Sequence, residues 1–174
     1  IISTDGDGDR PLISDENGNW LRGDIAGVLC ARYLEVDKVV TPVSSNSAVE
    51  KSGYFEQVVR TRIGSPYVIE AMTALLSEHK AVAGYEANGG FLQASELSLA
   101  DNTLSPLPTR DAVIVPLTIL LLADKLAMPI SELLNTLPKR FTASDRLKNF
   151  PTELSQSILA SMQTNDQEQN LKAI

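Results

Sequence analysis

Short apolar segments that alternate with helix-forming sequence are the feature that most constrains the fold of this 174-residue chain. Three such segments are rich in β-branched or small apolar residues and are bounded by turn-forming residues, a pattern typical of strands. They cover residues 38–43, 57–62 and 81–85. Alternating strands and helices predict a layered α/β fold, because each crossover helix must cover one face of a sheet.

Apolar periodicity places three helices around these strands. The spacing of apolar residues predicts helices over residues 24–35, 66–79 and 110–127. Ser65 is expected to cap the second helix, with Pro66 as its first residue. Pro116 lies inside the third helix, which predicts a kink or a late start. Residues 91–99 are expected to form a further strand and residues 101–109 a loop, and a short helix is expected from about Thr152.

Charge and hydropathy exclude several classes of partner. The chain has 15 Lys and Arg against 22 Asp and Glu, a net charge of -7, which argues against nucleic-acid binding. The most apolar segment, residues 113–123, is about half the roughly 20 residues that a membrane span requires. We therefore expect a core helix there and no membrane partner.

The single cysteine, Cys30, is expected in the core and fits a reducing, cytoplasmic location. The lone His79 is assigned no role.

An acidic, glycine-rich segment begins the chain. Residues 4–10 read TDGDGDR, with carboxylates at alternate positions, and such oxygen ligands on a tight turn suit a hard divalent cation. A solvated acidic turn is the simpler alternative. A helix–loop–helix calcium site is disfavoured, because Arg10 occupies the position that requires glycine. A guanidinium beside a divalent cation is also what a transferring phosphoryl group needs.

Two motifs together resemble the α-D-phosphohexomutases, and within that family the bacterial phosphomannomutases. These motifs are TDGDGDR at residues 4–10 and GYEANGG at residues 84–90. The segment TRIGSPYVIEAM (61–72) and the pair Ser45 and Asn46 also look like the third of the family's four domains. In the family, the first domain carries a phosphoserine nucleophile, the third selects the sugar and the fourth binds the substrate phosphate.

The resemblance assigns roles to individual residues. It implies that Asp5, Asp7 and Asp9 bind Mg²⁺ and that Arg10 stabilises the transferring phosphoryl group. Glu86 matches the glutamate that accepts hydrogen bonds from sugar hydroxyls. Further candidates for contact with the substrate are Gly84, Ser45, Asn46, Asn88, Arg62, Ser65 and Tyr67. Asn88 stands where many members have serine, and Gly90 where many have histidine, so the preferred sugar stays open.

The resemblance also divides the chain. Residues 1–34 are expected to be the end of domain 2 with the metal loop, residues 35–137 domain 3, and residues 138–174 a linker and the start of domain 4. The expected partners are therefore a hexose phosphate and the missing domains of the same longer protein. Because the chain contains neither the phosphoserine motif nor the phosphate-binding loop, it is expected to be inactive alone.

The implied activity is that of an isomerase. A phosphoserine enzyme would interconvert hexose 6-phosphate and hexose 1-phosphate through a bisphosphate intermediate, with mannose as the expected hexose. Phosphoglucomutase and phosphoglucosamine mutase are alternatives within the family. A noncatalytic, calcium-stabilised binding module is the alternative from a different class.

Overall fold

The computed structural model describes residues 1–76, 80–99, 102–145 and 147–162. It divides into two compact units, residues 1–141 and residues 142–174. His79 and the polar tail after residue 162 lie outside the described residues. The second unit contains α6 (Thr152–Met162), which begins where the sequence predicts a helix. All the candidate site residues lie in the first unit.

The first unit is built on a mixed four-stranded sheet with the order β4-β3-β5-β6. The three predicted strands are confirmed as β3 (Lys38–Pro42), β4 (Gln57–Thr61) and β5 (Val82–Tyr85). They are parallel to one another, with β3 in the centre, whereas β6 (Phe91–Gln93) is antiparallel to β5. Because parallel strands share their direction, the loops that follow β3, β4 and β5 meet at one edge of the sheet.

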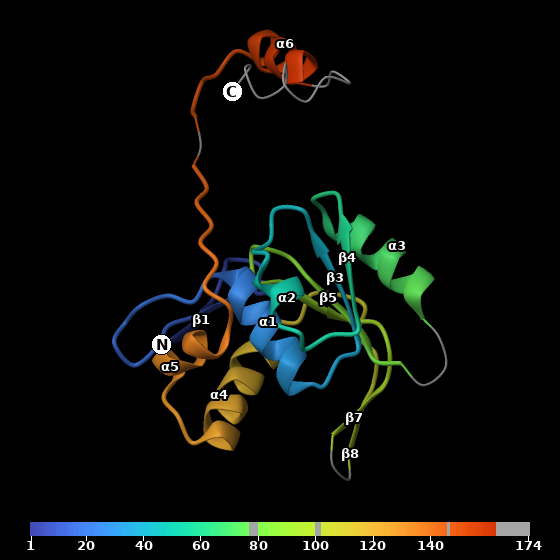
Figure 1. Ribbon diagram of the computed structural model, residues 1–174, viewed down its shortest axis with the longest axis vertical. Coiled ribbons are helices and arrows are strands. Elements are labelled where there is room, and N and C mark those ends of the chain that lie inside the picture. The colour runs from blue at the N-terminus through green and yellow to red at the C-terminus, as the bar shows by residue number, and fades with distance from the viewer. Residues whose placement is uncertain (77–79, 100–101, 146, 163–174) are drawn as a thin grey trace. The chain divides into compact units, whose positions relative to one another are not determined.

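Helices cover both faces of this sheet (Figure 1). On one face, α1 (Gly23–Tyr33) and α4 (Ile114–Leu126) pack over a core that includes Val39, Ala83 and Tyr85. On the other face, α3 (Ser65–Leu75) covers Val40 and Val82. Successive residues of a strand thus belong to opposite layers, as strand geometry requires. The predicted layered α/β fold is confirmed.

The helix ends refine the sequence predictions. Helix α1 ends at Tyr33, and Glu35 then adopts a left-handed φ of 52°. The prediction of Ser65 as an N-cap is wrong, because Gly64 holds the cap position and Ser65 is the first helical residue. Helix α4 starts at Ile114, which places Pro116 in the first turn, where its missing N–H costs no hydrogen bond. Of the two outcomes expected for Pro116, the late start is the one observed.

Residues 91–99 do not form one strand, and the segment that follows them is not entirely loop. Strand β6 ends at Gln93, and β7 (Leu97–Leu99) pairs with β8 (Asn102–Leu104) in a separate hairpin. The buried Gln93 side chain explains the break, because the two hydrogens of its Nε2 are shared among the carbonyl oxygens of Ser95, Leu104 and Ser105, at 3.0, 2.9 and 3.1 Å. A single polar residue such as Gln93 gives no pattern in the sequence from which this role could be predicted.

The remaining elements of the first unit are short. They are β1 (Ile2–Thr4), β2 (Pro11–Ile13), α2 (Ala48–Lys51), α5 (Ile130–Leu133) and a 3-10 turn (Leu134–Thr136). Cys30 is fully buried, as predicted, and burial raises the pKa of its thiol. Among the described residues, no single helix is long and apolar enough to cross a membrane; α4 and residues 130–136 meet the criteria of length and composition only as a pair bent by 86°.

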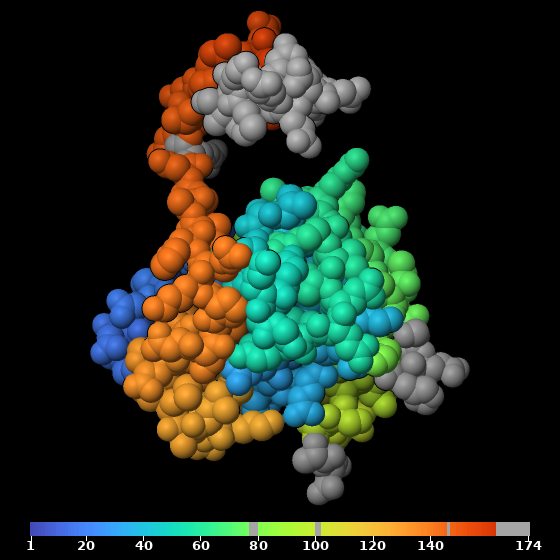
Figure 2. Space-filling view, in the orientation of Figure 1, coloured from blue at the N-terminus to red at the C-terminus, as the bar shows by residue number. Residues whose placement is uncertain are grey.

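The N-terminal residues pack with the sheet domain. Helix α1 rests on Tyr85, since a Cβ at Gly27 would lie 2.4 Å from the Tyr85 ring. Ser131 donates hydrogen bonds to the Glu16 carboxylate, and Figure 2 shows the orange surface that follows α4 beside the blue N-terminal surface. Residues 1–34 therefore share a compact unit with the sheet. The domain limits at residues 34 and 137 stay predictions.

Gly84 provides a test of the packing between α3 and the sheet. A Cβ at this position would lie 2.5 Å from Val68 Cγ1, 2.8 Å from Met72 Sδ and 3.1 Å from the Val40 carbonyl oxygen. We expect Gly84→Ala to lower the free energy of unfolding by about 1–3 kcal/mol through overpacking, measured by urea denaturation. Gly6→Ala is the control, since no atom lies within 4 Å of its added methyl group. Equal stability of the two variants would contradict this packing argument.

Candidate active site

The acidic motif forms the loop of a β-hairpin. Strands β1 and β2 are antiparallel, and residues 5–10 connect them. The Asp5 Oδ1 atom accepts a hydrogen bond from the Arg10 backbone N–H at 3.2 Å, and the Asp5 carbonyl oxygen accepts one from Gly8 at 3.1 Å. One carboxylate oxygen from each of Asp5, Asp7 and Asp9 lies within 4.8 Å of the other two. The turn therefore gathers the three predicted metal ligands.

The chemistry of this loop fits a hard divalent cation. Asp5 Oδ2 and Asp9 Oδ1 are buried and accept no hydrogen bond from the described residues. Both oxygens lie beside the Arg10 guanidinium, and a divalent cation bound at the loop would give each of them a direct ligand bond. Strands flank the loop on both sides, so it is not the loop of a helix–loop–helix calcium site.

Arg10 supplies positive charge to the same carboxylates. Its guanidinium forms an ion pair with Asp5 and lies 3.5 Å from Asp7 Oδ1 and 3.4 Å from Asp9 Oδ1. The negative charge of Asp5 raises the pKa of Arg10. Burial acts to raise the pKa of Asp5, but the hydrogen bonds and charge of Arg10 outweigh it and leave that pKa below its ordinary value. The Arg10 side chain is about half exposed, so it can contact a ligand at the loop.

The second motif forms a tight loop after β5, residues 86–90, called the Glu86 loop below. The Glu86 N–H donates to the Gly90 carbonyl oxygen at 2.9 Å, and the Gly89 N–H donates to the Glu86 carbonyl oxygen at 3.0 Å. Asn88 Oδ1 accepts a hydrogen bond from the Gly90 N–H at 3.0 Å. Asn88 thus stabilises the turn, although it is exposed to solvent. Glu86, in contrast, is only 5% exposed.

Close backbone contacts hold the Glu86 loop against the N-terminal residues. A Cβ at Gly89 would lie 3.0 Å from the Pro11 carbonyl oxygen, and one at Gly23 would lie 2.2 Å from the Gly89 nitrogen. A hollow of about 200 Å³ lies where the two loops meet. It is lined by Thr4, Asp5, Arg10, Pro11, Leu12 and Asn88. The fold therefore brings Asp5 and Arg10 of the acidic loop and Asn88 of the predicted sugar loop together at one hollow.

Arg110 is a component of this site that the sequence reasoning missed. Its Nε–H donates to Glu86 Oε2 at 2.9 Å, and a terminal N–H donates to Asp9 Oδ2 at 2.8 Å. A third N–H approaches Ser65 Oγ at 3.5 Å. The hydrogen bond to Asp9, followed by that to Glu86, raises the pKa of Arg110. One available signal was its place just before α4, since a cation near a helix N-terminus is unfavourable unless anions surround it.

Ser45 and Asn46 lie in the loop after β3, but both are buried. Ser45 Oγ is 2.7 Å from Thr41 Oγ1, with which it forms a hydrogen bond. Asn46 Nδ2 donates to the Arg140 carbonyl oxygen at 3.0 Å, and Asn46 Oδ1 accepts from the Ala48 N–H at 2.8 Å. These polar atoms therefore maintain the fold, and their contact with substrate stays a prediction.

The remaining candidates for contact with substrate are Gly84, Arg62, Tyr67 and Ser65. Gly84 is buried within β5, and its lack of a side chain accommodates α3. Arg62 and Tyr67 line a separate hollow of about 490 Å³, with the guanidinium 5.8 Å from the ring centre. Ser65 contacts Arg110, which binds Glu86, and so lies beside the Glu86 loop.

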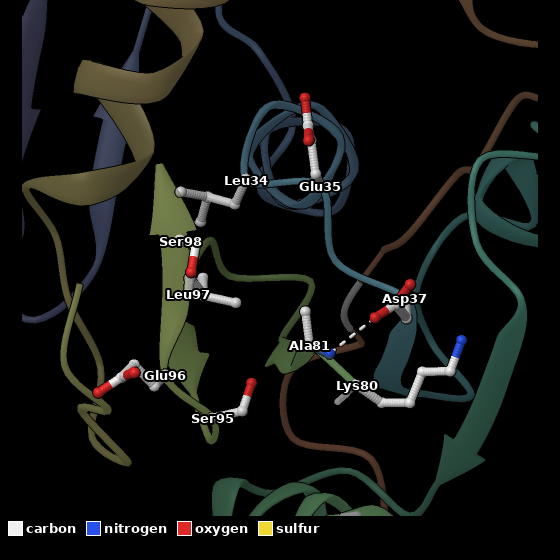
Figure 3. Close-up of a pocket in the computed structure, with 9 residues that line it drawn as sticks. All are labelled: Leu34, Glu35, Asp37, Lys80, Ala81, Ser95, Glu96, Leu97 and Ser98. Atoms are coloured by element: carbon white, nitrogen blue, oxygen red, sulfur yellow. Dashed lines mark hydrogen bonds between the residues drawn. The ribbon is translucent and has the colours of Figure 1, made fainter. Parts of the chain in front are cut away.

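A larger hollow of about 510 Å³ lies at the other end of the strands (Figure 3). Asp37 and Ala81, which immediately precede β3 and β5, line it, and Asp37 Oδ2 accepts a hydrogen bond from the Ala81 N–H at 2.7 Å. Lys80 and Glu96 add further charge to its wall. None of the predicted site residues lines this hollow, so size alone does not identify the candidate active site.

Comparisons with known proteins agree with the fold and with the family that the two motifs predict. Residues 22–141 match the sequence profile of the phosphoglucomutase/phosphomannomutase alpha/beta/alpha domain III. The chain therefore belongs to this phosphohexomutase family, as its motifs predict, and the matched range includes α1 together with the sheet.

Two curated relatives are phosphomannomutases. The chain is 49% identical to that of Salmonella muenchen over 174 residues, covering 100% of this chain and 36% of the relative. It is 43% identical to that of Sinorhizobium fredii over 161 residues, covering 92% and 34%. The chain thus spans about a third of the length of the relatives it matches.

A solved structure supports the fold alone. An Aspergillus fumigatus N-acetylphosphoglucosamine mutase, solved as a serine-to-alanine variant in complex with glucose 1,6-bisphosphate, superposes with a TM-score of 0.60 at 16% identity. The match covers 99% of this chain and 46% of that chain.

Gly23 tests the contact between α1 and the Glu86 loop. In Gly23→Ala, the added methyl group would lie 2.2 Å from the Gly89 nitrogen and 2.6 Å from the Ala87 carbonyl oxygen, so the loop must move. We expect the amide hydrogens of residues 86–90 to exchange about tenfold faster, measured by mass spectrometry. The control Gly53→Ala strains a left-handed residue with φ of 70° in open space. Unchanged exchange in the Gly23 variant would contradict the contact.

Proposed function

We propose that this chain is the metal-binding and sugar-recognition part of a phosphomannomutase, an isomerase that interconverts mannose 6-phosphate and mannose 1-phosphate. The observation that carries the proposal is the meeting of the acidic loop and the Glu86 loop at one hollow, with Asn88 in its wall. The identities of 49% and 43% to two phosphomannomutases favour mannose over the glucose and glucosamine alternatives. The phosphoserine and bisphosphate steps belong to the rest of the longer enzyme.

The acidic loop would hold Mg²⁺ through Asp5, Asp7 and Asp9. Bound Mg²⁺ supplies charge stabilisation for phosphoryl transfer. Arg10 lies among these carboxylates and keeps its positive charge at any physiological pH. We infer that Arg10 orients and stabilises the phosphoryl group beside the loop, because a guanidinium pairs with two phosphoryl oxygens at once. This chemistry requires that the rest of the enzyme deliver the phosphoryl group to the hollow.

Glu86 would orient the sugar rather than its phosphate. A single carboxylate can accept hydrogen bonds from two adjacent hydroxyl groups of a hexose, and these bonds would be strong in a largely buried site. Glu86 is largely buried, and the interaction of Oε2 with Arg110 holds its carboxylate in place. An anchor on the ring can serve both phosphorylated isomers, if the two poses present the same hydroxyl groups.

Metal binding is tested with Asp7→Asn, because Asp7 is the most exposed of the three ligands and its loss disturbs the fold least. We expect at least about tenfold weaker binding of Mg²⁺, by calorimetry, and of Mn²⁺, by electron paramagnetic resonance, since even outer-shell changes cost that much. The control is Glu96→Gln, an exposed acid in the hollow of Figure 3. Unaltered affinity would remove Asp7 from the ligand set, and tight Ca²⁺ binding without phosphosugar affinity would favour a noncatalytic module.

Sugar recognition is tested with Glu86→Gln in the full-length enzyme. We expect kcat/KM for mannose 1-phosphate to fall about 10- to 100-fold, because hydrogen bonds to a charged group contribute about 1.5–3 kcal/mol. Turnover of mannose 1-phosphate and glucose 1-phosphate would be compared, with Glu96→Gln as the control. Unchanged efficiency with both sugars would exclude Glu86 from substrate recognition.

A further inference from the structure

Arg110 joins two loops that are far apart in the sequence. It bonds Glu86, 24 residues away, and Asp9, 101 residues away, through nitrogen atoms of the same guanidinium. The group is planar and rigid, so both bonds can form only when the two carboxylates lie at one particular separation and orientation. Its side chain is 27% exposed, which leaves these bonds partly shielded from water.

Each carboxylate keeps one oxygen outside this bridge. Arg110 binds Oδ2 of Asp9, whereas Oδ1 accepts no hydrogen bond from the described residues. It binds Oε2 of Glu86, and within the described part of the chain no hydrogen bond is made to Oε1. The bridge thus fixes both groups while leaving one oxygen of each to meet a cation or a hydroxyl group.

The base of the Arg110 side chain is fixed by its neighbours. The Asp111 N–H donates to the Phe91 carbonyl oxygen at 2.9 Å, which ties this segment to β6. Asp111 Oδ1 accepts hydrogen bonds from the N–H groups of Val113 and Ile114 at 2.8 and 3.1 Å, which holds the backbone at the start of α4. The arginine therefore extends from rigid structure towards the two loops.

Gly90 makes room for the arginine stem. A Cβ at Gly90 would lie 2.7 Å from Arg110 Cδ and 3.1 Å from both Cγ and Nε. The stem therefore passes directly over the glycine backbone, and a methyl group there would displace it. This contact gives a way to move Arg110 without removing its charge.

We propose that Arg110 is a positioning residue that sets the separation between the metal-binding carboxylates and the sugar-binding Glu86, an inference that rests on the mutase function proposed above. The phosphoryl group lies at the metal loop and the sugar ring at Glu86, so this separation determines how well the reacting groups are aligned. Misplacement by about 1 Å can cost about 100-fold in rate.

The test uses Arg110→Lys, Arg110→Met and Gly90→Ala in the full-length enzyme, with Lys125→Met in the last turn of α4 as the control. We expect kcat to fall by about 100-fold in both Arg110 variants, and in the same direction in Gly90→Ala. We expect lysine not to restore kcat, because its ammonium group lacks the planar, rigid set of donors that binds two carboxylates at once. The ratio of kcat/KM for mannose 1-phosphate to that for glucose 1-phosphate should also fall, since a mobile Glu86 discriminates sugars less well.

The affinity for metal distinguishes a positioning role of Arg110 from an effect on cation binding. We expect the Mn²⁺ affinity, measured by electron paramagnetic resonance, to be retained in Arg110→Lys, which keeps the positive charge. In Arg110→Met it should be retained or increased, because a competing positive charge is removed from Asp9. Activity that returns at saturating Mg²⁺ would overturn the proposal, and so would full activity of Arg110→Lys. If Arg110→Met does not fold, as judged by circular dichroism, the other two variants decide.

The activity of the unmodified enzyme distinguishes a failure of this inference from a failure of the proposed function. If the unmodified enzyme turns over no hexose phosphate, the mutase proposal fails and the positioning role fails with it. If the unmodified enzyme is active and the variants retain its kcat and its sugar ratio, only the role of Arg110 is wrong.

Discussion

The parallel alignment of β3, β4 and β5 is the constraint on which the site depends. Two apolar layers, one under α1 and α4 and one under α3, bury both faces of these strands and fix their direction. All three strands then end at the same edge, so the Glu86 loop and the start of α3 are neighbours there. The acidic hairpin reaches this edge because Pro11 and Gly23 pack directly on the Glu86 loop.

Charge balance completes the arrangement. Asp5, Asp7, Asp9 and Glu86 place four carboxylates around a small region, and their mutual repulsion must be offset. Arg10, within the acidic loop, and Arg110, in the segment before α4, contribute positive charge here. The two arginines offset only part of the charge of the four carboxylates, so the region stays negative and suits a bound cation.

Sequence reasoning succeeded where a local pattern determines structure. The strand pattern of residues 38–43 depends on neighbours along the chain and was predicted, and for Pro116 one of the two expected outcomes, the late helix start, is observed. It failed for Gln93, whose amide bonds carbonyl groups across a turn, and for Arg110, whose partners are 24 and 101 residues away. Sequence reasoning placed Ser45 and Asn46 at the end of β3. It could not show that their polar atoms already form hydrogen bonds within the protein. Long-range hydrogen bonds carry little periodic signal in the sequence.

The loop after β3 has a further consequence through Arg60. Its guanidinium donates hydrogen bonds to the carbonyl oxygens of Pro42 and Ser45 at 2.8 and 2.9 Å and pairs with Glu50. These bonds tie the backbone of the loop to β4 and restrict its movement. The conformation of this loop therefore depends on a side chain from the neighbouring strand β4, in addition to the loop's own polar residues.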